Sequence, residues 1–123
     1  MLEPLAIIFY ERVMPGSQLS NRLLDLKYRV LAIDDAARLP ATVRREMPLL
    51  LLADLAAKGD ILDAIKKIRA DASTSHLPII AFAPDHSPEL LAAAQESGAS
   101  LAVTESALTG HLPQMLEQAL RVD

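Results

Sequence analysis

The stretch of sequence that decides the fold is Pro48-Leu49-Leu50-Leu51-Leu52-Ala53-Asp54-Leu55. A short, continuous apolar run of this kind fits a strand that is buried on both faces of a parallel sheet. By composition the four leucines are equally compatible with a helix, but the length of the run and the proline before it favour a strand. The stretch therefore predicts a buried strand with Asp54 close to its carboxyl end.

Other apolar runs alternate with amphipathic segments along the whole chain. The runs are Leu5–Phe9, a weaker one at Arg29–Ile33, Leu77–Phe82 and Leu101–Val103. Between them, apolar residues recur at the spacing of one helical face, in the sets Leu19/Leu23/Leu26, Ile61/Ile65/Ile68 and Leu112/Leu116/Leu120. Strands and helices are therefore predicted to alternate from one end of the chain to the other.

Helix boundary signals support this division. Ser87 is a suitable N-cap with Pro88 at the first helical position, and Gly98 suits the left-handed residue that ends the same helix. The preceding helix is predicted to begin after Asp60, and a short one near Pro40.

This order predicts a single α/β domain over residues 1–123. Five βα units, (βα)5, require right-handed crossovers and a parallel sheet. We expect a doubly wound, three-layer structure with strand order 2-1-3-4-5 and a site at the carboxyl ends of the first and third strands. The predicted core includes Ile7, Leu50, Leu52, Ile80 and Val103.

Composition removes several classes of function. The chain of 123 residues has no cysteine, which excludes thiol chemistry and thiolate metal sites. Its net charge is −4, and its basic residues occur as isolated pairs such as Arg44-Arg45, so we expect no nucleic-acid binding. The first apolar run is too short for a signal peptide or a membrane span, and we expect a cytoplasmic protein without membrane contact.

Taken in order and spacing, several segments resemble the receiver domains of two-component response regulators. Receivers place a proline six residues before the phosphoacceptor aspartate, as Pro48 stands before Asp54. The strand-like segment Leu77–Ala83, the helix end and turn Glu96–Ser100 and the segment Leu24–Val30 resemble further parts of that family. The resemblance implies a flavodoxin-like, receiver-like fold with Asp54 at the phosphoacceptor position.

The departures from the family pattern are equally informative. The acidic pair that holds Mg²⁺ in receivers reads Tyr10-Glu11 here, and the hydroxyl residue that ends the fourth strand is Ala83. The lysine at the end of the fifth strand is replaced by Glu105, and the aromatic switch position by Ala102. With these departures, the resemblance implies a degenerate pseudo-receiver.

These departures bear directly on phosphoryl transfer. Mg²⁺ and a fixed cation offset the repulsion when a carboxylate attacks a phosphoryl group. Glu105 puts an anion where the cation stands, and Ala83 cannot donate to a phosphoryl oxygen. Glu11 and Asp54 are left as weak metal candidates, so we expect no cofactor. Arg12 or Lys58 is predicted to pair with Asp54 in place of the metal.

The leading hypothesis is a signalling module without enzymatic activity that works through protein contacts and lacks Mg²⁺-dependent phosphorylation. The partner would be a histidine kinase, another signalling protein or a second copy, bound through the fourth helix, fifth strand and fifth helix. The alternative is a phosphorylatable receiver that takes a phosphoryl group from a histidine kinase on Asp54, with Mg²⁺ as cofactor. A small-molecule binder or enzyme on the same type of sheet is a third possibility, because the fold alone excludes neither.

Overall fold

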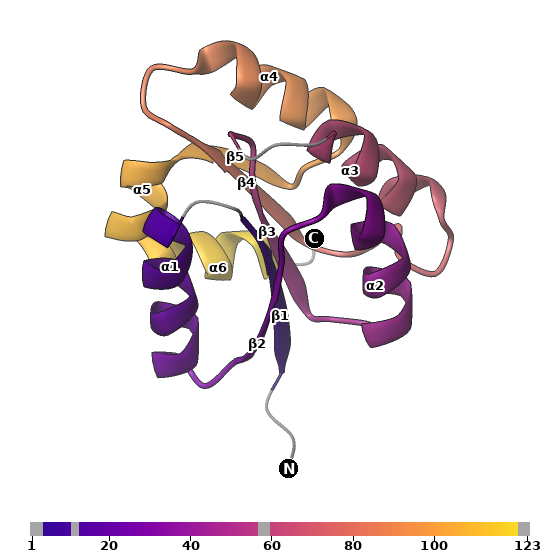
Figure 1. The fold of residues 1–123 in the computed structure, drawn as a ribbon. Helices are drawn as coiled ribbons and strands as arrows, with labels where there is room; N and C mark the ends of the chain where they lie inside the picture. Colours follow the sequence, from indigo (N-terminus) through magenta and orange to yellow (C-terminus); the bar gives the residue numbers. More distant parts are fainter. Residues whose placement is uncertain (1–3, 11–12, 57–59, 121–123) are drawn as a thin grey trace.

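A five-stranded parallel sheet forms the centre of the molecule (Figure 1). The computed structural model describes residues 4–10, 13–56 and 60–120. The strands run in the order β2-β1-β3-β4-β5, which confirms the predicted topology. Their bounds are β1 Leu5–Phe9, β2 Arg29–Ile33, β3 Leu50–Asp54, β4 Ile79–Ala83 and β5 Leu101–Thr104.

Helices cover both faces of the sheet. One face carries α1, α5 and α6, and the other carries α2, α3 and α4 (Figure 1). Their bounds are α1 Val13–Asp25, the 3-10 turn η1 Ala36–Arg38, α2 Leu39–Glu46, α3 Ile61–Ala70, α4 Pro88–Ser97, α5 Glu105–Gly110 and α6 Leu112–Leu120. None of the helices in these described ranges combines the length and apolar character that crossing a membrane requires.

The last βα unit differs from the prediction, because its helix is divided into α5 and α6. Thr104 caps the first piece, its Oγ1 accepting from the Ala107 N–H at 3.2 Å. The second piece, α6, begins next to Pro113. Proline has no backbone N–H, so it cannot continue the helical hydrogen bonds of α5. A sharp break therefore separates two short helices where one was expected.

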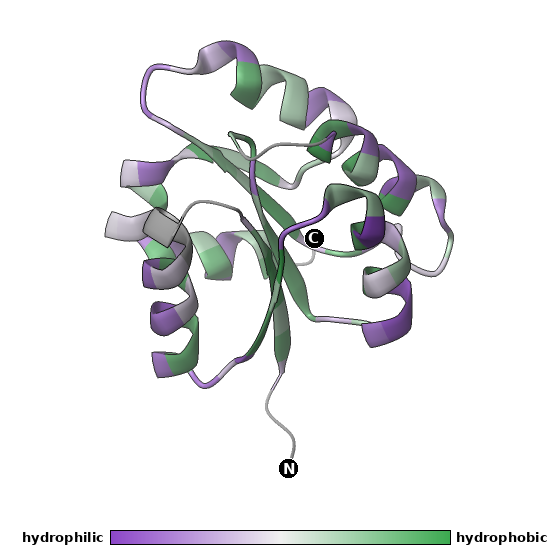
Figure 2. Ribbon diagram, in the orientation of Figure 1, coloured by the Kyte–Doolittle hydropathy of each residue, from purple (hydrophilic) through white to green (hydrophobic). Residues whose placement is uncertain are grey.

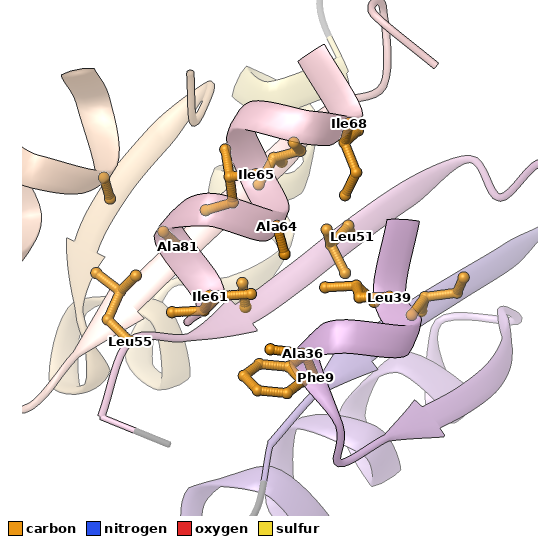
Figure 3. Close-up of a cluster of buried hydrophobic side chains, with 14 of the residues drawn as sticks. Phe9, Ala36, Leu39, Leu51, Leu55, Ile61, Ala64, Ile65, Ile68 and Ala81 are labelled. Atoms are coloured by element: carbon orange, nitrogen blue, oxygen red, sulfur yellow. The ribbon is translucent and has the colours of Figure 1, made fainter. Parts of the chain in front are cut away.

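Two apolar cores lie between the sheet and its helices. Figure 3 shows the first, in which Phe9, Leu51 and Ala81 of the sheet meet Ile61, Ile65 and other residues of α3. The second lies on the α1–α6 face, where Leu19 and Leu23 are fully buried. Figure 2 shows that the strands are hydrophobic and that the helices around them carry both hydrophobic and hydrophilic residues, as the sequence pattern predicts.

One expectation about burial is wrong, and one predicted helical face is shorter than expected. Val103 is only partly buried, because β5 is an edge strand and has a neighbour on one side alone. Leu26 is exposed because α1 ends at Asp25, one residue before the predicted helical face would include it. The other predicted core residues, Ile7, Leu50, Leu52 and Ile80, are fully buried.

Candidate functional site

Asp54 lies at the carboxyl edge of the sheet, where the predicted site was placed. It is the last residue of β3, between the ends of β1 and β4, and pairs with Phe82 in the β3–β4 register. The next backbone N–H, of Leu55, donates to the Phe82 carbonyl at 2.8 Å. The Asp54 side chain is fully buried, with 0% relative exposure. The sheet therefore fixes one carboxylate at the end of its central strand.

A buried carboxylate is costly unless it accepts hydrogen bonds or meets a cation. The Ala56 N–H donates to Asp54 Oδ1 at 2.9 Å, so the backbone just after the strand provides part of the compensation. The contact is of the kind expected if backbone amides of its own loop, in place of an ion pair, hold the Asp54 carboxylate. Arg12 and Lys58 lie outside the described residues, and their pairing with Asp54 stays a prediction.

The residues that end β4 and follow β5, Ala83 and Glu105, supply neither a side-chain hydrogen-bond donor nor a cation that could stabilise a phosphoryl group on Asp54. Ala83 ends β4 and is fully buried, so a methyl group faces the interior beside Asp54's strand. Ala83 pairs with Thr104 in the β4–β5 register, and Glu105 follows as the first residue of α5. The Thr104 Oγ1 accepts the hydrogen bond that caps α5. Glu105 thus places a carboxylate directly after β5, next to the end of β4.

At the first strand, Tyr10 follows β1 and its N–H donates to the Ile33 carbonyl at 3.0 Å. It borders a hollow of about 260 Å³ that is also lined by Ala32, Ile33 and Asp34. Glu11 lies outside the described residues. Ala102, at the predicted switch position, is partly buried on β5 and pairs with Ala81.

One hydrogen bond at this edge of the sheet was not predicted from the sequence. The Ser106 hydroxyl donates to Asp85 Oδ2 at 2.5 Å, which joins the loop after β4 to the start of α5. This hydrogen bond holds the pKa of the Asp85 carboxyl below its usual value. The two residues are 21 positions apart, and each alone looks like an ordinary loop or helix-start residue, so no local signal indicated the bridge.

Mg²⁺ requires a near-octahedral set of oxygen ligands. Within the described ranges, no three acidic or histidine side chains gather into a group that could hold a metal ion. Asp54 offers one carboxylate whose Oδ1 already accepts a backbone hydrogen bond. The described residues therefore fit Mg²⁺ poorly.

Solved structures with the same architecture are receiver domains. A response regulator from Chloroflexus aurantiacus superposes with a TM-score of 0.88 and 18% identity over 96% of this chain and 98% of that chain. The chain has the receiver fold. The receiver domain of a sensor histidine kinase from Pseudomonas aeruginosa, which has a magnesium ion coordinated in its active site cleft, gives 0.85 at 18% identity over 96% and 98%. A chemotaxis response regulator of Vibrio cholerae gives 0.83 at 17% over 96% and 99%.

At these identities the likeness establishes the receiver fold and nothing finer. No protein-family model and no curated protein matches the sequence. Within this fold, Asp54 ends β3, Ala83 ends β4, and Glu105 follows the last residue of β5.

Proposed function

We propose that the chain is a receiver-type signalling module that acts through protein contacts, without Mg²⁺-dependent phosphorylation of Asp54. It has no enzymatic activity of its own in this proposal. Residues 1–123 act as one domain, in the cytoplasm. The receiver fold supports the general class, and the chemistry of the strand ends supports the finer statement.

The observation that carries the proposal is the charge at the end of β5. Glu105 follows the strand directly beside the end of β4, where phosphoryl transfer needs a cation to balance the developing negative charge. Ala83 adds no hydrogen-bond donor, and Asp54 is fully buried. A phosphoryl group on Asp54 would meet an anion and a methyl group.

The alternative is a phosphorylatable receiver that accepts a phosphoryl group from a histidine kinase. It is supported by the carboxylate retained at the end of β3. In that case Mg²⁺ would be the cofactor, with Glu11 and Asp54 as ligands. One structurally similar receiver domain has magnesium in its active site cleft, which is compatible with this alternative. A phosphorylation experiment separates the two proposals.

We expect no phosphoryl incorporation when the purified chain is incubated with acetyl phosphate and Mg²⁺ and measured by intact-protein mass spectrometry. The physical reason is that Glu105 places a carboxylate after β5, where phosphoryl transfer needs a cation. The matched control restores the missing groups in the variant Tyr10→Asp/Ala83→Ser/Glu105→Lys, which is expected to gain incorporation that Asp54→Asn abolishes. Incorporation into the unmodified chain that depends on Asp54 would instead establish the alternative.

For the partner we propose the surface of α4, the edge strand β5 and the divided last helix, α5 and α6. β5 is partly exposed along its length, and Leu90, Leu91 and Leu101 are each partly buried. The surface offers a mixture of apolar and polar groups to a kinase, another signalling protein or a second copy.

Placing a charge on this surface is expected to weaken association about tenfold, because a desolvated cation costs roughly 1.4 kcal/mol or more at an interface. The change is Ala92→Arg on the exposed side of α4, and association is measured by analytical ultracentrifugation, alone and with candidate kinases. Ala41→Arg, the same change on α2, is the control and should leave association intact. Equal effects of the two variants would refute this surface.

A further inference from the structure

The loop between β4 and α4, residues 84–87, is hydrogen-bonded to the start of α5 (Figure 1). Asp85 lies two residues after β4, and Ser106 is the second residue of α5. The Ser106 hydroxyl donates to Asp85 Oδ2 at 2.5 Å, and the Ser106 N–H donates to Asp85 Oδ1 at 3.4 Å. A short O–H···O⁻ bond of this kind is charge-assisted and strong for a hydrogen bond. The Asp85–Ser106 bridge therefore fixes one position of the loop.

The residue next to the bridge has an unfavourable backbone conformation. His86 has a φ of 69°, in the left-handed region that a residue with a side chain adopts at a cost. Lys27 and Met47 share this region, but both follow a helix, where a left-handed residue is the usual ending. His86 precedes a helix. No helix end accounts for its conformation.

The start of α4 lacks the cap that its sequence provides. Ser87 occupies the N-cap position with φ −123° and ψ 58°, and its side chain makes no cap hydrogen bond. The first helical bond, from the Leu91 N–H to the Ser87 carbonyl, is long at 3.3 Å. By contrast, the side chains of Asp60 and Thr104 cap α3 and α5. The bridged loop thus leaves a good capping residue unused.

These local costs oppose the bridge. A left-handed residue and a missing cap are each of the same order as the contribution of one hydrogen bond to a charged group. Without the bridge, His86 can return to a negative φ. Ser87 can then become extended, so that its Oγ accepts from the N–H of Glu89 or Leu90. The loop has a second conformation that relieves both costs together.

We infer that residues 84–87 form a two-state latch. In the bridged form, which the structure shows, Asp85 binds Ser106 and α4 is uncapped; in the capped form, the bridge is open and Ser87 caps α4. The starts of α4 and α5 belong to the proposed partner surface, so a partner that prefers either form shifts the latch toward it. The latch rests on the fold, and its tests use the chain alone, so they are separate from phosphorylation and from partner binding.

Breaking the bridge is expected to protect an amide at the start of α4. In Ser106→Ala the capped form becomes the main one, and the Ser87 hydroxyl oxygen accepts from the N–H of Glu89 or Leu90. Hydrogen exchange at one of these two amides is expected to slow about fivefold. NMR of the isotope-labelled full chain measures the exchange. A bridge that merely held the loop in place would give the opposite result, faster exchange after its loss.

A second serine–carboxylate hydrogen bond provides the matched control. The Ser73 hydroxyl donates to Asp71 Oδ1 at 2.8 Å within one exposed loop. Ser73→Ala removes this bond and is expected to leave exchange at the start of α4 unchanged. Asp85→Ala removes both hydrogen bonds of the bridge from its other side, and is expected to reproduce the effect of Ser106→Ala.

The cap itself is detected by changing Ser87 in two backgrounds. In the unmodified chain its side chain makes no cap bond, so Ser87→Ala is expected to change the equilibrium constant of urea unfolding by less than about twofold. In the Ser106→Ala background it removes the newly formed cap, and the unfolding constant is expected to rise about fivefold.

Glycine in place of His86 should change the sign of its effect between the same backgrounds. In the unmodified chain His86→Gly relieves the left-handed strain and is expected to lower the unfolding constant about twofold. In Ser106→Ala the strain is already gone. There glycine only adds freedom to the unfolded chain, and the unfolding constant is expected to rise about twofold.

Two results would overturn the inference. The first is exchange at the start of α4 that stays the same or becomes faster in both Ser106→Ala and Asp85→Ala. The second is an equal effect of Ser87→Ala with and without the bridge, because the capped form would then not replace the bridged one.

Discussion

Replacing Arg69 by methionine is expected to lower the free energy of unfolding by about 2–4 kcal/mol. Arg69 lies at the end of α3 and its guanidinium joins two loops. It donates from Nε to the Gly98 carbonyl at 2.7 Å, from Nη1 to the Ser75 and Leu77 carbonyls at 3.0 and 2.6 Å, and from Nη2 to Ser100 Oγ at 3.1 Å. Each partly buried acceptor left without its donor costs about 1 kcal/mol or more.

The charge of Arg69 persists despite its burial. Desolvation lowers its pKa from the ordinary value, but a guanidinium titrates so far above neutrality that it stays protonated. Three carbonyl oxygens around it supply partial negative charge in place of a carboxylate. Methionine keeps most of the packing of the side-chain stem and removes the charged guanidinium with its donors, so the variant measures the loss of this charged donor group.

Urea unfolding measures the effect, with Lys67→Met on the same helix as control. Lys67 is exposed and pairs with Asp63 at 3.0 Å, and loss of such a surface pair is expected to change stability by less than about 0.5 kcal/mol. An Arg69→Met effect as small as that of the control would mean that water replaces the lost donors.

The fold followed from the sequence because its signals are local. Apolar runs of strand length, helical spacing and boundary residues such as Asp60 and Gly98 each act within a few positions. Asp60 does cap α3, its Oδ1 accepting from the Asp63 N–H at 3.0 Å, and Gly98 is left-handed with φ 119°. Ser87 begins α4 as predicted, although its side chain makes no cap hydrogen bond.

For the site, the sequence predicted which residues stand at the strand ends but not the contacts that they and their neighbours make. Asp54, Ala83 and Glu105 follow from strand ends, which the sequence locates. The Asp85–Ser106 bridge and the contacts of Arg69 join residues far apart in the chain, and they depend on how loops pack after the sheet has formed.

Gly98→Ala is expected to cost about 2–3 kcal/mol, the second large effect. At φ 119° any side chain is strained, which alone costs on the order of 1–3 kcal/mol. An added Cβ would also lie 2.6 Å from Arg69 Cγ, so the Arg69 side chain must move and stretch its hydrogen bond to the Gly98 carbonyl. Gly110→Ala is the matched control, because nothing lies within 4 Å of a Cβ there, and its effect should stay within about 0.5 kcal/mol.

A double-mutant cycle separates the two contributions to the Gly98→Ala effect. In an Arg69→Ala background the Cγ atom is gone, so Gly98→Ala should cost only its backbone strain. The two changes are then expected to be less than additive by about 1 kcal/mol, as residues in direct contact usually are. Strict additivity would show that Arg69 moves aside freely, and that the turn between α4 and β5 is held by the conformation of Gly98 and not by the guanidinium packed against it.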